Sequence, residues 1–334
     1  MFLNQCLFQI KRNTLFFIEE HYPALPLNVA LTYRCDMGCF YCNTRGLDGS
    51  FKGEISEDNF SKLLAWMKKQ GMRKIMFVGG EPTQHTRLES ILELCRKNKI
   101  DIYMASNCAY PRDINYIIAK HVKVLFVNCS TEYASTQGLD LLNKLKFLRK
   151  YGVKLILRVN MSTANKNEIG QVRGMARELK ARIRVAIINS PVLTGGLLDK
   201  EKIRKLTFFT EEFARQCLKE SIYIYLARPL PRCFFDDKKW QELRRLILAK
   251  SRCFVGYRGN YACRAVVNPD LSVFGCFKNL KKADNILGFS SLYQLSEFYK
   301  ANTNTGAEHC ALDKHNNCRY LVDRKCSGAC FDYA

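Results

Sequence analysis

The chain has 334 residues, of which 47% are hydrophobic and 25% are charged, so it is long enough for one large domain and a smaller one. No window approaches the roughly 18 apolar residues of a membrane span, and the N-terminal positive charges follow the apolar run, the reverse of a secretory signal. We therefore expect a cytoplasmic protein with no membrane partner, and the net charge of +22 indicates an acidic partner, an acidic substrate group or a solvated basic surface.

The first part of the chain is predicted to alternate strands and helices. Residues 1–26 form an amphipathic helix and a Pro-bounded lead-in. Apolar strands are expected at 27–33, 74–78, 102–105, 122–127, 154–159 and 183–188, with helices at about 56–70, 87–98, 111–119, 138–150 and 166–180. Apolar strands that alternate with helices are typical of a parallel sheet. Residues 27–204 therefore predict an α/β fold, a partial (β/α)6 barrel of the TIM type, with its chemistry where the strands end.

The C-terminal part has a different composition. Residues 205–252 are basic and more helical, and we expect them to link the barrel to a small domain at 253–334. A cysteine-dense stretch of this size buries little apolar surface, so bound metal would stabilise it. In a large chain without a secretory signal, sixteen cysteines indicate metal or redox chemistry. The cysteines of this small domain are Cys253, Cys263, Cys276, Cys310, Cys318, Cys326 and Cys330.

Three further cysteines follow the first strand with the spacing Cys35-x3-Cys39-x2-Cys42. Iron–sulfur clusters are held by cysteine thiolates, and a four-iron cluster takes four ligands. Three local thiolates therefore indicate a cluster with one iron open to a ligand that is not protein. A structural zinc site would be closed by four ligands, usually from two pairs. The remaining alternative is three incidental thiols on a loop.

Polar motifs follow the next strands at the point where each strand ends. Gly79-Gly80-Glu81-Pro82 follows the second strand, Ser106-Asn107 the third and Cys129-Ser130-Thr131-Glu132 the fourth, while Arg158 and Asn160 end the fifth. Taken singly, the glycines could form a tight turn, the Ser-Asn pair a helix cap and the arginine an ion pair. Because the carboxyl ends of parallel strands meet at one edge, their order predicts one shared site.

The cysteine motif, with Tyr41 directly before its last cysteine, resembles the signature of the radical SAM superfamily. The resemblance implies a 4Fe–4S cluster on Cys35, Cys39 and Cys42 whose open iron binds the amino and carboxylate groups of S-adenosylmethionine. One electron, from an external donor such as a flavodoxin or a ferredoxin, would break the C5′–S bond. The resulting 5′-deoxyadenosyl radical would abstract a hydrogen atom from the substrate, while the protein orients both molecules.

The strand-end motifs resemble the cofactor motifs of the same superfamily. The segment 79–82 is similar to its GGEP motif, which implies that the backbone and Glu81 receive the methionine amino group. Ser106-Asn107 is similar to its T-N-G motif, with Cys108 in place of the glycine.

The segment at 130–132 resembles an S-x-D motif near the ribose and carboxylate, with Glu132 in place of aspartate. Arg158 and Asn160 are candidates for the same pocket. The cofactor-binding residues that the resemblance implies are Tyr41, Gly79, Gly80, Glu81, Pro82, Ser106, Asn107, Ser130, Glu132, Arg158 and Asn160.

The C-terminal cysteines resemble the auxiliary-cluster domains of the SPASM/twitch group. Cys263-x12-Cys276 is similar to the hairpin of that group, with Leu271 where glycine is usual, and Cys326-x3-Cys330 is similar to its C-terminal pair. This implies one auxiliary 4Fe–4S cluster and leaves a second one open, with zinc as the rival metal. The predicted ligands are Cys263, Cys276, Cys326 and Cys330, followed by Cys318, Cys310 and Cys253.

Three cysteines are candidates for returning a hydrogen atom to a substrate radical. Cys108 and Cys129 end barrel strands and could face the cavity, and Cys233 follows the link away from the barrel. The other helical cysteines are interpreted as small buried hydrophobes.

The main functional hypothesis is maturation of a ribosomally synthesised peptide by cross-linking, epimerisation or oxidation. The basic charge suits an acidic leader, and only about 26 residues precede the barrel, so a separate leader-recognition protein or direct docking is expected. The first alternative is the same radical chemistry on a small molecule, such as dehydrogenation or epimerisation of a sugar or amino acid. The second is a zinc-stabilised nucleic-acid-binding protein, which is disfavoured because no zinc finger, KH loop or RNP-like motif accompanies the charge.

Overall fold

The computed structural model describes much of the barrel and part of the C-terminal region. The described residues are 26–39, 41–42, 44, 53–129, 138–161, 166–187, 200–226, 238, 241, 265–276 and 279–302. The predicted N-terminal helix and most of the cysteine-rich tail lie outside these residues. Within them, no helix is long and apolar enough to cross a membrane.

The described strands form one ten-stranded sheet in the order β10-β9-β8-β1-β2-β3-β4-β5-β6-β7. Strands β1 to β7 are parallel to their neighbours, β8 is parallel to β1, and β9 and β10 are antiparallel. The strands are β1 (Leu27–Thr32), β2 (Lys74–Gly79), β3 (Asp101–Ser106), β4 (Val122–Asn128), β5 (Lys154–Met161), β6 (Arg182–Ile187), β7 (Ile224–Leu226), β8 (Val266–Val267), β9 (Ser272–Cys276) and β10 (Asn279–Asn285).

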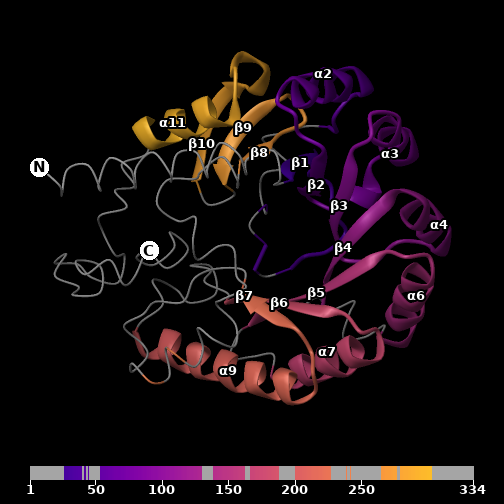
Figure 1. Ribbon diagram of the computed structural model, residues 1–334, viewed down its shortest axis with the longest axis vertical. Coiled ribbons are helices and arrows are strands. Elements are labelled where there is room, and N and C mark those ends of the chain that lie inside the picture. Colours follow the sequence, from indigo (N-terminus) through magenta and orange to yellow (C-terminus); the bar gives the residue numbers. More distant parts are fainter. Residues whose placement is uncertain are drawn as a thin grey trace, which may run out of the picture.

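The helices lie on the outside of the curved sheet (Figure 1). They are α2 (Glu57–Lys69), α3 (Leu88–Lys97), α4 (Arg112–His121), α6 (Gly138–Lys150), α7 (Lys166–Glu178), α9 (Lys200–Lys219) and α11 (Leu292–Asn302), with short 3-10 turns η2 (Pro82–Gln84) and η7 (Ile286–Gly288). The predicted α/β fold and partial barrel are confirmed. Helix α9 crosses the expected boundary at 204, and β7 adds a seventh parallel strand after it. The domain boundaries themselves stay a prediction.

The two faces of the barrel strands have different environments. On β5, Leu155, Leu157 and Val159 are buried in the core that also contains residues of the covering helices. Because side chains alternate along a strand, the residues between them face the concave side. The register aligns Asn128 of β4 with Arg158 of β5 and Arg184 of β6, so these three residues share one level of that concave face.

The described C-terminal strands continue the barrel sheet at β1. The Tyr33 hydroxyl donates to Asn268 Oδ1 at 2.5 Å, and both residues are buried. On the helical side, Trp66 Nε1 of α2 donates to the carbonyl of Phe289 at 2.8 Å. Contacts between residues more than 200 positions apart therefore fix the start of the barrel against the C-terminal region.

The turn between β8 and β9 contains a leucine in the left-handed backbone conformation. Leu271, where the SPASM/twitch resemblance expects glycine, has a φ of +65°. Its side chain is buried, and its N–H donates to the carbonyl of Asn268 at 2.9 Å. The turn thus requires the left-handed conformation that glycine adopts most easily, and burial of leucine offsets the strain.

Tyr33→Phe tests the link between the barrel and its C-terminal strands. We expect the free energy of unfolding to fall by about 1–3 kcal/mol, because the buried Asn268 oxygen loses its donor. Urea denaturation followed by circular dichroism measures the change. The control is Tyr116→Phe on α4, where the tyrosine is 63% exposed and removal of its hydroxyl should change stability by less than about 0.5 kcal/mol. Equal effects of the two substitutions would contradict the role of Tyr33.

Candidate active site

The three signature cysteines lie in the loop that follows β1. All three are free thiols; Cys35 and Cys42 are exposed and Cys39 is half-buried. The N–H of Cys42 donates to the carbonyl of Cys39 at 3.1 Å, which closes a turn between them. Among the described residues, no three Cys, His, Asp or Glu side chains already converge as a metal site. A ligand set that closes only around its metal is usual, because binding supplies the energy that orders the ligands.

The chemistry of this donor set fits an iron–sulfur cluster. Although the residue is exposed, neighbouring atoms partly desolvate its sulfur, and this desolvation, together with the nearby charges of Glu81, Asp36 and Cys39, raises the pKa of Cys35 to about 11. A thiolate at this position therefore needs a positive partner, which a bound metal cluster supplies. Three thiols on one loop, two of them exposed, leave one position of a four-iron cluster without a ligand from this loop.

Two glycines hold the end of β2 against the start of this loop. The N–H of Gly80 donates to the carbonyl of Thr32 at 2.9 Å, and the N–H of Glu81 donates to the carbonyl of Arg34 at 2.8 Å. A Cβ at Gly79, where φ is +110°, would lie 2.6 Å from the Thr32 oxygen, and one at Gly80 would overlap the Arg34 carbonyl. Only glycine permits this approach, so the pair positions the residue directly before Cys35.

The carboxylate of Glu81 joins the ends of β2 and β3. The residue is 3% exposed. Its Oε1 accepts from the Thr83 N–H at 3.2 Å, the Thr83 hydroxyl at 2.8 Å and the Ser106 hydroxyl at 2.9 Å, and its Oε2 accepts from the Asn107 N–H at 2.8 Å. Burial raises the pKa of Glu81, and these donors act in the opposite direction.

Asn107 extends this connection to the cysteine loop. Its Nδ2 donates to Asp36 Oδ1 at 3.2 Å, and its Oδ1 accepts from the Ala109 N–H at 2.8 Å. Asp36 directly follows Cys35, so hydrogen bonds connect the residue next to the first signature cysteine with the ends of β2 and β3. The structure thus brings together the motifs at 35–42, 79–82 and 106–107, as their order along the chain predicts.

Cys108 occupies a strained position in the turn after β3. Its φ is +60°, which explains why the superfamily motif has glycine here. The Lys144 ammonium, buried in α6, donates to the carbonyls of Cys108 and Tyr110 at 3.3 and 2.7 Å and stabilises the turn. Burial raises the pKa of the Cys108 thiol to about 12.

Both described candidates for hydrogen donation are core residues. Cys108 is fully buried and Cys129 is 4% exposed, and both belong to the main hydrophobic core. Burial also raises the pKa of the Cys129 thiol, whose Sγ lies 3.6 Å from the carbonyl of Val127. Their role in hydrogen transfer stays a prediction, and access from the concave face would require the core to open.

Tyr41 connects the cysteine loop to the opposite strands. Its hydroxyl donates to Asn128 Oδ1 at 3.1 Å, and Asn160 Nδ2 donates to the same oxygen at 3.4 Å. Burial raises the pKa of Tyr41. Asn128 was absent from the residues predicted from sequence, although its place as the last residue of β4 is a signal that could have identified it.

Residues 29–166 match the sequence model of the Radical SAM superfamily. This part of the chain is a radical SAM domain. Such a domain implies a 4Fe–4S cluster and S-adenosylmethionine as its cofactors. The match spans β1 to β5 and contains the three signature cysteines and the motifs at the ends of β2 to β5.

Curated relatives of the radical SAM domain include probable GTP 3′,8-cyclases. The chain is 27% identical over 217 residues to that of Pyrococcus horikoshii, covering 59% of this chain and 67% of the relative. It is 31% identical over 101 residues to that of Thermococcus kodakarensis, covering 29% of this chain and 32% of the relative. The matched part of the chain thus spans about one third of one relative and about two thirds of the other.

Solved structures with the same fold include two described as bound to S-adenosylmethionine or AdoMet. Streptococcus suis SuiB superposes with a TM-score of 0.63 at 15% identity, covering 97% of this chain and 77% of SuiB. The structure described as native anSMEcpe superposes with a TM-score of 0.62 at 17% identity, covering 92% of this chain and 90% of that chain. These likenesses show the fold.

Other predicted residues lie where the structure gives less detail. Pro82 begins η2 and is buried, Arg158 is half-buried on the concave face, and the backbone of Cys276 ends β9. The following predicted residues lie outside the described part: Ser130, Glu132, Cys233, Cys253, Cys263, Cys310, Cys318, Cys326 and Cys330.

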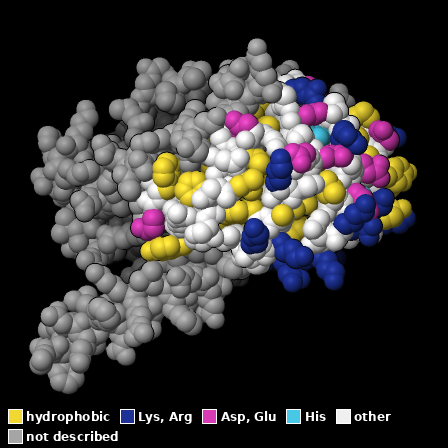
Figure 2. Space-filling view, turned by 90° about the horizontal axis from the view of Figure 1, so that it is seen from above, with side chains coloured by type: hydrophobic (Ala, Val, Ile, Leu, Met, Phe, Trp, Pro, Cys, Tyr) yellow, Lys and Arg dark blue, Asp and Glu magenta, His cyan; other side chains and the backbone are white. Residues whose placement is uncertain are grey.

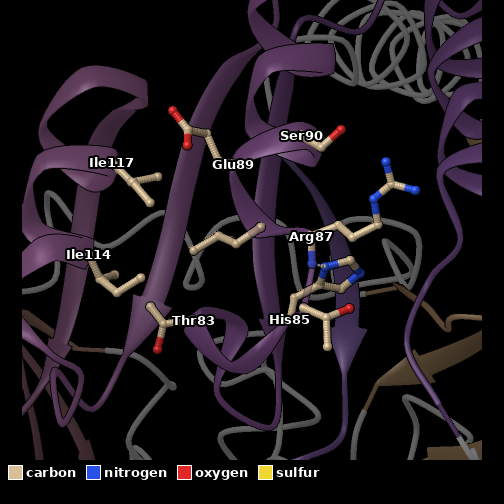
Figure 3. Close-up of a pocket in the computed structure, with 9 residues that line it drawn as sticks. Thr83, His85, Arg87, Glu89, Ser90, Ile114 and Ile117 are labelled. Atoms are coloured by element: carbon tan, nitrogen blue, oxygen red, sulfur yellow. Dashed lines mark hydrogen bonds between the residues drawn. The ribbon is translucent and has the colours of Figure 1, made fainter.

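A groove next to the Glu81 turn lies in the outer helical layer (Figure 3). Its charged side chains have partners: Arg87 pairs with Glu57 at 3.0 Å, and Glu89 lies 3.5 Å from Lys120. The charges that line this groove are therefore already compensated. The lining residues are Thr83, His85, Thr86, Arg87, Leu88, Glu89, Ser90, Ile114 and Ile117.

Glu81→Gln tests the connection between the strand ends. The amide would present a donor to groups that already donate, so we expect the free energy of unfolding to fall by about 2–3 kcal/mol. Urea denaturation measures the fall. The control Glu89→Gln removes an exposed carboxylate on α3 and should cost less than about 0.5 kcal/mol. The connection is refuted if both variants match the wild type.

Paired substitutions at Cys108 isolate the backbone strain. Cys108→Gly and Cys108→Ala both remove the sulfur, but only glycine relaxes a φ of +60°, so the glycine variant should be more stable by about 1 kcal/mol. The same pair at Cys129 is the control, and there alanine should be the more stable residue by about 0.5–1 kcal/mol. Differential scanning calorimetry gives both differences, and alanine being favoured at both positions would contradict the strain.

Proposed function

We propose that this protein is a radical SAM enzyme whose cluster is held by Cys35, Cys39 and Cys42. When bound, the cluster and S-adenosylmethionine supply a 5′-deoxyadenosyl radical that takes a hydrogen atom from the substrate. The observation that carries this proposal is the chain of hydrogen bonds from Asp36 through Asn107 to Glu81, which ties the cysteine loop to the neighbouring strand ends.

The residues of these strand ends have positioning and binding roles in the proposal. Glu81 and Ser106 order the turns after β2 and β3, and backbone groups from Gly79 to Pro82, with Glu81, would bind the methionine amino group. Asn107 holds the cysteine loop. Tyr41, Arg158 and Asn160 would bind the cofactor from the side of β4 and β5, and Ser130 and Glu132 are proposed to bind its ribose and carboxylate.

The C-terminal cysteines are proposed to hold one auxiliary 4Fe–4S cluster. Cys276 lies at the end of β9, and β8 pairs with β1, which supports a position beside the barrel. Domain limits at 26/27, 204/205 and 252/253 belong to the same proposal. The further ligands proposed are Cys263, Cys326 and Cys330, with Cys318, Cys310 and Cys253 for a second cluster.

The proposed substrate is a ribosomally synthesised peptide. The fold is shared with SuiB, solved with its precursor peptide SuiA, and with anSMEcpe, solved with the Kp18Cys peptide. The net charge of +22 supports an acidic leader, recognised directly or by a separate protein, and a flavodoxin or ferredoxin would supply the electron. A small anionic molecule is the second candidate, because the probable GTP 3′,8-cyclases are relatives in sequence.

Anaerobic reconstitution tests the radical chemistry. With dithionite and S-adenosylmethionine, the wild type should release 5′-deoxyadenosine, and a Cys35→Ala, Cys39→Ala, Cys42→Ala triple variant should lose about four irons per chain and all of this product. The matched control is Cys95→Ala, which removes a buried thiol on α3. A colourless wild type that holds zinc without iron or sulfide would overturn the proposal.

Mass spectrometry of a candidate peptide encoded nearby distinguishes the reactions. Loss of two hydrogens indicates cross-linking or oxidation, and an unchanged mass with deuterium gained from the solvent indicates epimerisation. Turnover of a phosphorylated small molecule by an enzyme that leaves the peptide unmodified would favour the second candidate instead.

A further inference from the structure

The concave face of the radical SAM fold carries a concentration of positive charge on β6. Arg182 and Arg184 alternate there with Ile183 and Val185, which are buried in the helix-facing core. The arginines therefore point to the side away from the helices. Two residues apart on one strand, they lie roughly 7 Å apart along it.

Neighbouring strands add to this group at the same level. Arg184 pairs in register with Arg158 of β5 and with Tyr225 of β7. Burial raises the pKa of Tyr225, and the charges of Arg184, Arg158 and Arg182 act in the opposite direction. The Tyr225 hydroxyl thus lies within the field of all three guanidinium groups.

Each of the two arginines of β6 packs against an aromatic ring. Among the described residues, no carboxylate forms an ion pair with either of them. The Arg182 guanidinium lies 5.0 Å from the centroid of the Tyr223 ring, and that of Arg184 lies 5.7 Å from the Phe126 ring. Stacking of this kind orients a guanidinium and leaves its N–H groups at the ring edge available to another partner.

On the outer surface, basic residues lie beside acidic ones. On the face shown in Figure 2, Lys and Arg side chains are interspersed with acidic ones. Among the described residues, surface pairs such as Lys123–Asp101 at 2.7 Å and Lys62–Asp58 at 2.6 Å compensate basic charge. By contrast, no Asp or Glu occupies a described concave position of β4 to β7. Arg184, Arg158 and Tyr225 are half-buried and Arg182 is exposed, and guanidinium groups that lie this close together are stabilised by an anion.

We propose that Arg182, Arg184 and Tyr225 bind an anionic group of the substrate, a phosphate or a carboxylate. The inference rests on the proposed function, because it assigns the anion to the molecule that loses the hydrogen atom. Asn160, two residues beyond Arg158 toward the carboxyl end of β5, belongs to the Tyr41 network. A substrate bound by its anionic end would therefore extend its other end toward the cysteine loop.

Titration calorimetry of the reconstituted full chain at low ionic strength tests the site. The two probes are tripolyphosphate and tetraglutamate, which distinguish phosphate from carboxylate. Arg184→Gln and Arg182→Gln should each weaken binding of the preferred probe by about tenfold or more, because each removes a charged hydrogen-bond donor. Arg149→Gln, an exposed arginine of α6, makes the same change in net charge and should leave binding within about twofold.

The outcomes separate this inference from the proposed function. If the wild type binds neither probe, or if Arg149→Gln weakens binding as much as Arg184→Gln, the anion site is overturned, whether or not the wild type cleaves S-adenosylmethionine. If the wild type fails to cleave S-adenosylmethionine but binds a probe through Arg184, the proposed function fails and the site stands. Should Arg184→Gln not fold, Arg184→Lys keeps the charge and should still bind more weakly, because the two-pronged geometry is lost.

Discussion

The buried carboxylate of Glu81 is the interaction on which the arrangement of the site depends. It is the common acceptor for donors from its own turn and from the end of β3. Without it, several buried donors would have no partner, and each such group costs free energy. Its hydrogen bonds use both carboxylate oxygens and so fix the orientation of the side chain. Oε2 accepts only from the Asn107 N–H, so it can still accept from a further donor.

The two faces of the strands around this site have different roles: one supplies the hydrophobic core and the other carries polar side chains. Side chains toward the helices, such as Leu157 and Ile183, are fully buried and supply the core. The side chains between them do not belong to that core, so polar residues can occupy these positions. It therefore holds amides at the ends of β4 and β5 and arginines on β6. A βα barrel can thus change its substrate while its core is unchanged.

The sequence predicts the six main strands well because each is a nearly continuous apolar run followed by a motif. It also predicts that Cys35, Glu81 and Asn107 lie close together, because each follows a strand and parallel strands end at the same edge of the sheet. It does not predict that β8 pairs with β1, because that contact joins residues more than 200 positions apart. Nor does the apolar pattern show that Cys108 and Leu271 adopt positive φ, although both stand where the resemblance expects glycine.

The distribution of positive charge is more informative than its total. A net charge of +22 could reflect only a solvated surface, and many described surface lysines and arginines indeed lie beside carboxylates. The arginines of β6 lie on the concave face, where Arg184 is half-buried and Arg182 is exposed, and burying an unpaired guanidinium group costs free energy. A bound anion would offset that cost. The arginines of β6 thus indicate an anionic substrate more strongly than the basic exterior does, for a peptide and a small molecule alike.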